Sequence, residues 1–181
     1  MMAEYKLVSV KDSELNPGDQ IAVSCGIFGI SAYYHHGIFI SHRNGVIDLV
    51  GVPLDTRGVV EYKSISDFKA VGGEQLFILK RRLGMLRGTG SDQIYRVDYK
   101  SHRTAEDVVM TAKAELQNPI RWRTYNLKTC NCEHFASFCK IGHAQSVQIS
   151  SREKSASGRY IVDIASGALV SSGSSTSSSS H

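Results

Sequence analysis

The chain of 181 residues contains no hydrophobic run long enough to span a membrane. A spanning helix needs about 18 or more consecutive apolar residues. The longest candidate, YIVDIASGALV at Tyr160–Val170, is shorter and is interrupted by Asp163. The first residues, MMAEYKLVSVKDSEL, also lack the apolar segment of a signal peptide. We therefore expect neither a spanning anchor nor a secreted protein.

The sequence is also poor in excess charge and in paired cysteines. It has 21 basic and 17 acidic residues, a net charge of +4, which is too small to indicate a nucleic-acid partner but is compatible with an anionic membrane surface. Its four cysteines include no C-x-x-C redox pair, and no Asn-x-Ser/Thr glycosylation site occurs. Thiols without a secretory context stay free in a reducing compartment. We expect a cytoplasmic protein that associates with membranes at most peripherally and binds no nucleic acid.

Composition divides the chain into four parts. The end, SSGSSTSSSSH from Ser171, has too few apolar residues to bury a core, which predicts a disordered tail over 171–181. Residues 146–170 are predicted to be a linker or a short helix, and residues 1–14 an N-terminal extension. The compact domain is then expected over residues 15–145, a length that suffices for one hydrophobic core.

This compact part begins with strand patterns and ends with helix patterns. Five stretches predict strands: NPGDQIAVS, YYHHGIFIS, VIDLVGV, LFILKRR and QIYRVDY. The second and third flank HRNG, which is a hairpin signature. A helix is predicted over Thr104–Asn118, with Thr104 and Asp107 as a capping box and Pro119 beyond its end. A second helix is predicted from Asn131. Strands followed by helices indicate an α+β domain with an antiparallel sheet packed against helices.

The segment KTCNCEHFASFCK at Lys128–Lys140 carries the strongest chemical signal. Asn131 is a favourable N-cap, so Cys132 is predicted to be the first residue of a helix. The positive end of the helix dipole favours the thiolate form, which is the nucleophilic form of cysteine. Phe135, Ala136 and Cys139 form an apolar stripe that would pack this helix on the core.

Two other interpretations of these cysteines have to be weighed. Free cysteines are often small core residues, and Cys132 and Cys139 share the helix with an apolar stripe. A zinc site would use side chains that are close in sequence, namely Cys130, Cys132, His134, Cys139 and His143. Their C-x-C and C-x-H spacings do not match those of zinc sites. The sequence therefore predicts no metal and no cofactor, and leaves the core and the nucleophile interpretations of Cys132 open.

A nucleophilic cysteine needs a base, and the predicted hairpin offers His35, His36 and His42. Alternation along the strand places His35 on the face where Gly37 leaves room for another segment. His36 is predicted to lie buried on the opposite, more aliphatic face, and His42 to be a loop residue.

Asp48 lies between aliphatic residues on the returning strand, and its role depends on the hairpin register. A four-residue loop at Ser41–Asn44 would place Asp48 opposite Gly37 and diagonal to His35, close enough to orient the imidazole. A two-residue Asn44-Gly45 turn would place Asp48 about 20 Å from His35, as a solvated residue. The Asn-Gly dipeptide favours this second register.

Taken in order, NPGD, YYHHGIFIS with GVIDLVG, and YNLKTCNCEHFASFCKIG resemble the lecithin–retinol acyltransferase-like family over about Asn16–Gln145. The resemblance implies a circularly permuted, NlpC-type papain-like fold, in which the histidine strand precedes the cysteine helix. It also implies that Cys132 is the nucleophile and His35 the base. The family usually carries a second histidine where this chain has Asp48, and the resemblance therefore supports the register that brings Asp48 near His35.

This resemblance implies acyl transfer through a Cys132 thioester, with a glycerophospholipid as acyl donor, as in a phospholipase A or an acyltransferase. One alternative is a cysteine amidase or peptidase, which would use the same Cys–His pair. Another is a catalytically weak module that binds lipid or protein at a membrane, with Asp48 marking a degenerate triad. The basic segment Lys80–Gly88 is a candidate membrane contact, with a solvated loop as the alternative.

Overall fold

The computed structural model describes residues 3–27, 30–51, 56–71, 93–148, 160–163 and 168–171. Three predicted features lie outside these residues: the strand LFILKRR, the basic segment Lys80–Gly88, and all of the serine-rich tail beyond Ser171. Within the described part of the chain, no helix combines the length and the apolar character needed to cross a membrane.

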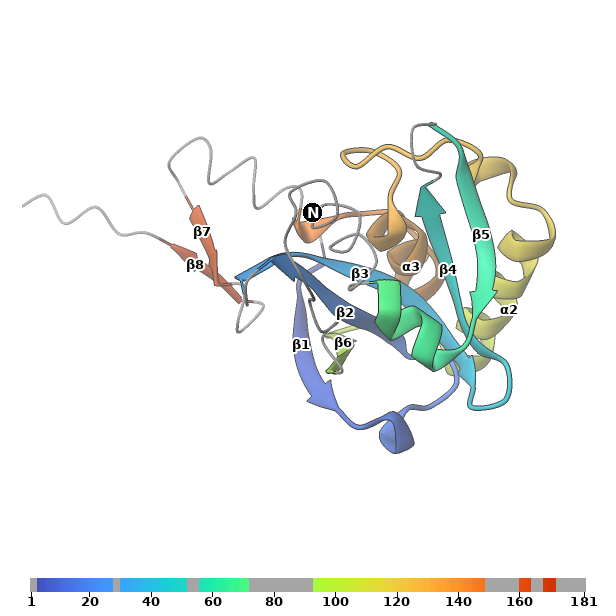
Figure 1. The fold of residues 1–181 in the computed structure, drawn as a ribbon, viewed down its shortest axis with the longest axis horizontal. Coiled ribbons are helices and arrows are strands. Elements are labelled where there is room, and N and C mark those ends of the chain that lie inside the picture. Colours follow the sequence, from blue (N-terminus) through green and yellow to red (C-terminus); the bar gives the residue numbers. More distant parts are fainter. Residues whose placement is uncertain are drawn as a thin grey trace, which may run out of the picture.

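A six-stranded antiparallel sheet organises the fold, in the order β1-β6-β2-β3-β4-β5 (Figure 1). Its strands are β1 (Tyr5–Val10), β2 (Gln20–Ile27), β3 (Ile30–Ser41), β4 (Gly45–Gly51), β5 (Gly58–Lys63) and β6 (Ile94–Tyr99). The strands predicted from NPGDQIAVS, YYHHGIFIS, VIDLVGV and QIYRVDY are confirmed. The predicted α+β class is therefore confirmed as well.

The sheet extends into residues that the sequence assigned to an N-terminal extension. Strand β1 pairs with β6 from Tyr5 opposite Tyr99 to Val10 opposite Ile94. Tyr5 and Leu7 pack beside a cluster that includes Val97 and Tyr99. This short edge strand has only weak alternation of its own, and its position depends on the partner strand rather than on local pattern.

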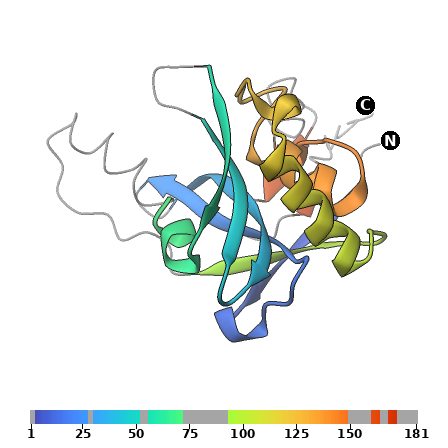
Figure 2. The ribbon, with the colours of Figure 1, turned by 90° about the vertical axis from the view of Figure 1, so that its right-hand side faces the viewer.

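Helices α2 (Ala105–Gln117) and α3 (Cys132–Ile141) cover one face of the sheet, and the short helical segment 65–71 lies on the other (Figure 2). The core under α2 and α3 includes Ile38, Ile47, Val108, Phe135 and Cys139. Phe39 and Val46 pack with Phe68 on the opposite face. The face of β3 that carries Ile38 is thus core, as predicted, and the other face is buried too.

Each of the two long helices begins at a side-chain cap. Thr104 Oγ1 accepts from the Asp107 N–H at 3.2 Å and donates to the Asp107 carboxylate at 2.7 Å, so the predicted capping box is only partly formed. Asn131 Oδ1 accepts from the N–H groups of Glu133 at 2.9 Å and His134 at 3.1 Å. The prediction that Cys132 begins a helix capped by Asn131 is confirmed.

The hairpin of β3 and β4 adopts the register that places Gly37 opposite Asp48. The expectation from the Asn44-Gly45 dipeptide is therefore wrong. Asn44 N–H donates to Ser41 Oγ at 3.0 Å, and Gly45 leaves the turn at φ 78° where the ladder is irregular between Phe39 and Ser41. Glycine serves here as the left-handed residue of a bulge that follows the turn, rather than as part of a two-residue turn.

Gly37 allows the helical segment 65–71 to approach the sheet. A Cβ atom at this position would lie 2.6 Å from Val46 Cγ1 and 2.8 Å from Phe68 Cε2. The prediction that Gly37 leaves room for another chain segment is confirmed, and that segment contributes Phe68. The Phe68 ring lies 5.3 Å from the His35 ring, centroid to centroid.

Strands β7 (Tyr160–Asp163) and β8 (Ala168–Ser171) form a separate two-stranded sheet. They fall largely within residues 146–170, which the sequence predicted as a linker or a short helix. Their pairing runs from Tyr160 opposite Ser171 to Asp163 opposite Ala168.

Candidate active site

Cys132 lies at the start of α3 with polar groups around its sulfur. Its side chain is buried, and it lies close enough to His35 and to the Tyr125 hydroxyl to raise the pKa of both groups. Cys139, two turns further along the same helix, belongs instead to the hydrophobic core. Both cysteines are buried, but of the two only Cys139 belongs to the apolar cluster under α2 and α3.

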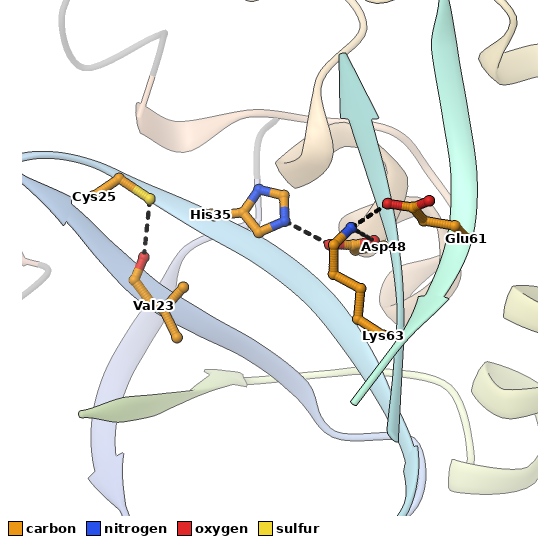
Figure 3. Close-up of polar contacts among 6 residues, drawn as sticks. All are labelled: Val23, Cys25, His35, Asp48, Glu61 and Lys63. Carbon is orange, nitrogen blue, oxygen red and sulfur yellow. Dashed lines mark hydrogen bonds and ion pairs between the residues drawn. The ribbon is translucent and has the colours of Figure 1, made fainter. Parts of the chain in front are cut away.

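His35 connects Cys132 to Asp48. Its Nε2 atom lies 2.7 Å from Asp48 Oδ2, because Asp48 faces Gly37 and is diagonal to His35 (Figure 3). With Nε2–H donating to the carboxylate, Nδ1 is the ring nitrogen left for the Cys132 sulfur. The structure thus brings all three predicted site residues, from β3, β4 and α3, into one cluster.

The surroundings of His35 favour the imidazolium ion. Burial lowers the pKa of His35, but the charge of Cys132 and hydrogen bonds to Asp48 and Cys132 outweigh it and raise the pKa to about 10. The Asp48 charge adds to this effect. The cluster is therefore arranged to stabilise the charged form of His35.

Asp48 is fully buried, so the interpretation as a solvated residue is wrong. Its second oxygen, Oδ1, accepts from Lys63 Nζ at 2.9 Å, and Lys63 also pairs with Glu61 on β5 (Figure 3). Burial lowers the pKa of Lys63, yet the charge of Asp48 and these hydrogen bonds raise it above its usual value. Lys63 thus supplies the positive charge that a buried carboxylate requires.

Sequence reasoning missed Lys63. The available signal was the stretch Gly58–Lys63, in which Glu61 and Lys63 are two residues apart and share one face of a strand. Nothing in that spacing indicates which neighbouring strand the lysine faces. The pairing of β4 with β5, with Asp48 opposite Glu61, decides it.

Tyr125 was also missed, and its hydroxyl lies beside the thiol. Both the side chain and the backbone of Cys132 influence the pKa of this hydroxyl. Burial, followed by the charge of Cys132, raises the pKa of Tyr125 well above its usual range, so the hydroxyl stays protonated. The ring lies against Gly51, where a Cβ atom would be 2.7 Å from Tyr125 Cδ1.

Cys25 is a second thiol near the cluster, and Figure 3 shows it beside His35. Its Sγ lies 3.8 Å from the Val23 carbonyl oxygen. Burial, with a contribution from the charge of Cys132, raises the pKa of Cys25 to about 12. Cys25 therefore remains a neutral thiol at ordinary pH and is a poor nucleophile.

The other histidines of the hairpin lie as predicted. His36 is buried, with Nδ1 3.2 Å from Gln20 Nε2 and Nε2 2.9 Å from Gln148 Nε2. Burial lowers the pKa of His36 to about 4, so the ring is neutral at pH 7. His42 is exposed in the turn, with its ring 5.1 Å from that of Phe39.

The two histidines weighed as zinc ligands each have a hydrogen-bonding partner within the protein. His134 Nδ1 lies 3.4 Å from the Asn131 N–H, and His143 Nε2 lies 3.2 Å from Gln145 Oε1. In the part of the chain that the structure describes, no three or more His, Cys, Asp or Glu side chains are grouped so as to hold a metal ion.

The His35 environment predicts an unusual titration. In the wild-type protein, NMR of the imidazole should show a ring that stays protonated well above pH 7, with a pKa near 10. Asp48→Asn removes the carboxylate that stabilises the imidazolium, and Cys132→Ala removes the side chain that also raises the His35 pKa, so each variant should lower this pKa by more than one unit. His36 is the internal reference and should stay neutral in all three proteins. An unchanged His35 pKa in both variants would contradict the proposed electrostatic coupling.

Comparison with known proteins adds one finding to this geometry. Residues 13–145 match the family model described as lecithin retinol acyltransferase. A comparison with curated proteins found no match.

Proposed function

Because the chain belongs to the lecithin retinol acyltransferase family, we propose that it is a thiol acyltransferase or phospholipase A-type enzyme that acts on glycerophospholipids through a Cys132 thioester. Membership of the family by itself indicates acyltransferase or phospholipase-type activity. The observation that supports the finer proposal is the buried cluster in which His35 is hydrogen-bonded to Asp48 and lies near Cys132, which raises the pKa of His35. Cys132 is proposed as nucleophile, His35 as base, and Asp48 as the group that orients His35.

The proposed reaction has two steps. His35 Nδ1 takes the thiol proton, and the Cys132 sulfur attacks the ester carbonyl carbon of the lipid. The carbon–oxygen ester bond then breaks, and the lysophospholipid leaves with the proton from His35. Water, an amine or a hydroxyl next attacks the thioester while His35 removes its proton, so that the acyl chain is released and Cys132 is regenerated as a thiol.

Chain order supports the permuted, papain-like arrangement as part of this proposal. The histidine lies on β3, about a hundred residues before the cysteine helix α3. Asp48 departs from the second histidine that the resemblance leads one to expect. A carboxylate at this position holds Nε2–H of His35 and stabilises its charged form, so the departure is compatible with activity.

Acylation of Cys132 is the central test. Purified protein is incubated with phosphatidylcholine carrying labelled acyl chains, and intact-protein mass spectrometry measures the acyl adduct. We expect a thioester on Cys132 and release of labelled fatty acid or of an acylated acceptor. Cys132→Ala should abolish both, because the attacking sulfur is gone.

The matched control is Cys130→Ala, which removes a half-buried thiol two residues from Cys132. It should retain the adduct and the release. Absence of any adduct or release from the wild-type protein would reject the proposal. Intact vesicle binding in that case would favour the binding module, and turnover of amide substrates alone would favour the amidase.

Tyr125 is proposed to stabilise the oxyanion of the tetrahedral intermediate. This oxyanion would form next to the Cys132 sulfur. The proposed donors are the Cys132 backbone N–H and the Tyr125 hydroxyl, whose pKa Cys132 influences. A protonated phenol is a good donor at a site from which water is excluded. Gly51 allows this arrangement, because any side chain there would push the ring away.

Tyr125→Phe should lower kcat by about 10²–10³-fold, as expected for the loss of one oxyanion donor. KM should change little, since the hydroxyl is proposed to act on the transition state. Steady-state kinetics with a soluble short-chain ester gives both values. Tyr62→Phe, at a half-exposed tyrosine on β5, is the control and should match wild type. A kcat of Tyr125→Phe within twofold of wild type would remove Tyr125 from the mechanism.

A membrane surface is the proposed source of the substrate. The segment that leads from α2 to Cys132 exposes two aliphatic side chains, Ile120 at 61% and Leu127 at 65%. Arg123 and Lys128, in the same segment, are exposed as well. Aliphatic and basic side chains together suit the surface of an anionic bilayer. We define this set of four residues as the rim.

The double variant Ile120→Ser/Leu127→Ser should weaken binding to vesicles of phosphatidylcholine and phosphatidylserine by tenfold or more, because it removes ~2 kcal/mol or more of apolar burial. Vesicle sedimentation measures the affinity. Met110→Ser, at a side chain that is 56% exposed on α2, is the control and should bind as wild type does. Turnover of a soluble ester should be unchanged in both. Equal binding by the rim variant and the wild type would contradict this role.

A further inference from the structure

Glu133, the residue after Cys132, is a buried carboxylate that accepts hydrogen bonds from Tyr5 and from residues 146–148. Tyr5 Oη donates to Oε1 at 2.9 Å, and the Val147 N–H donates to the same oxygen at 2.9 Å. Ser146 Oγ donates to Oε2 at 2.5 Å, and Gln148 Nε2 donates to it at 3.1 Å. The start of α3 is therefore tied to residues 146–148.

The Gln148 side chain also forms hydrogen bonds with β3. Its Oε1 accepts from the Tyr34 N–H at 2.6 Å, and its Nε2 donates to the Tyr34 carbonyl at 3.2 Å. The same Nε2 lies 2.9 Å from His36 Nε2. A neutral His36 ring can accept here, and the two amide hydrogens are then shared among this ring nitrogen, the Tyr34 carbonyl and the Glu133 carboxylate. Tyr34 and His36 are the two neighbours of His35 in the chain.

The side-chain amide of Gln148 thus connects Glu133, the neighbour of Cys132, with Tyr34 and His36, the neighbours of His35. Away from the Cys–His pair, α3 and β3 share an apolar cluster that includes Phe135, Ala136 and Ile38. Apolar packing is not directional and tolerates small shifts, whereas hydrogen bonds fix distance and angle. The amide therefore constrains the separation between helix and strand at the level of the site.

We propose that Gln148 is a positioning residue that sets the separation between the Cys132 sulfur and the His35 ring. The proposal rests on the proposed function and deepens it, since it assigns the alignment of the Cys–His pair to a residue outside the predicted domain 15–145. Gln148 acts through Glu133, Tyr34 and His36, and the proposal does not require it to contact the substrate.

The test compares Gln148→Ala with Gln145→Ala. Gln145 is a matched control: it is buried in the same segment and pairs twice with a backbone, accepting from Ala3 N–H at 2.9 Å and donating to Ala3 O at 2.6 Å. Gln148→Met, which keeps the length of the side chain without its amide, is the second variant should Gln148→Ala fail to fold. Thermal unfolding measures the stability of each protein.

We expect both Gln148 variants to lower kcat on a soluble ester by tenfold or more, with KM within threefold of wild type. A displaced Cys132 side chain stabilises the imidazolium less, so the pKa of His35 measured by NMR should fall. Gln145→Ala should lose stability to a similar extent and keep both the wild-type kcat and the wild-type pKa of His35.

A wild-type pKa of His35 and a wild-type kcat in folded Gln148→Met would overturn the positioning role, as would equal changes in Gln148→Met and Gln145→Ala. The NMR measurement does not need turnover. If the wild-type protein fails to process phospholipid or ester, the proposed function fails, and the pKa of His35 still decides whether Gln148 aligns the pair.

Discussion

The contact between His35 and Asp48 is the interaction on which the cluster depends. A buried imidazole and a buried carboxylate are stable only when each is hydrogen-bonded and compensated in charge. The 2.7 Å contact between His35 Nε2 and Asp48 Oδ2 gives each side chain a hydrogen bond and leaves Nδ1 as the ring nitrogen available to Cys132. Asp48 needs a second partner, which is Lys63 on the next strand. Asp48 thus comes with Lys63, and the two form one electrostatic unit.

Helix α3 presents Cys132 through polar contacts at its first turn. Asn131 accepts hydrogen bonds from two of the N–H groups there, and Glu133 connects the same turn to Tyr5 and Val147. Tyr5 and Gln148 therefore contribute to the surroundings of the site, although both lie outside the compact part expected from composition. A buried carboxylate draws donors from wherever the chain can supply them, because leaving it unsatisfied would be costly.

Signals that act over a few residues were read correctly from the sequence. The α+β class, the helix that begins at Cys132 after Asn131, and the buried state of His36 follow from caps and periodic apolar residues, which depend on near neighbours. The pairing of Cys132 with His35 followed from a resemblance in motif order, since spacing alone left a core role for the cysteine open. Strand β1 was missed because its pattern is weak without β6 beside it.

The sequence by itself determined the α+β class, the strands β2, β3, β4 and β6, and the residue at which α3 begins. The tertiary structure alone decided the register of the hairpin, where a bulge at Gly45 overruled the Asn-Gly signal. It also decided that Asp48 is a buried partner and that Lys63 and Tyr125 reach the site. The physical reason is the same in each case: these contacts join separate strands and loops, and which residues face each other across them depends on packing of the whole domain, not on local pattern.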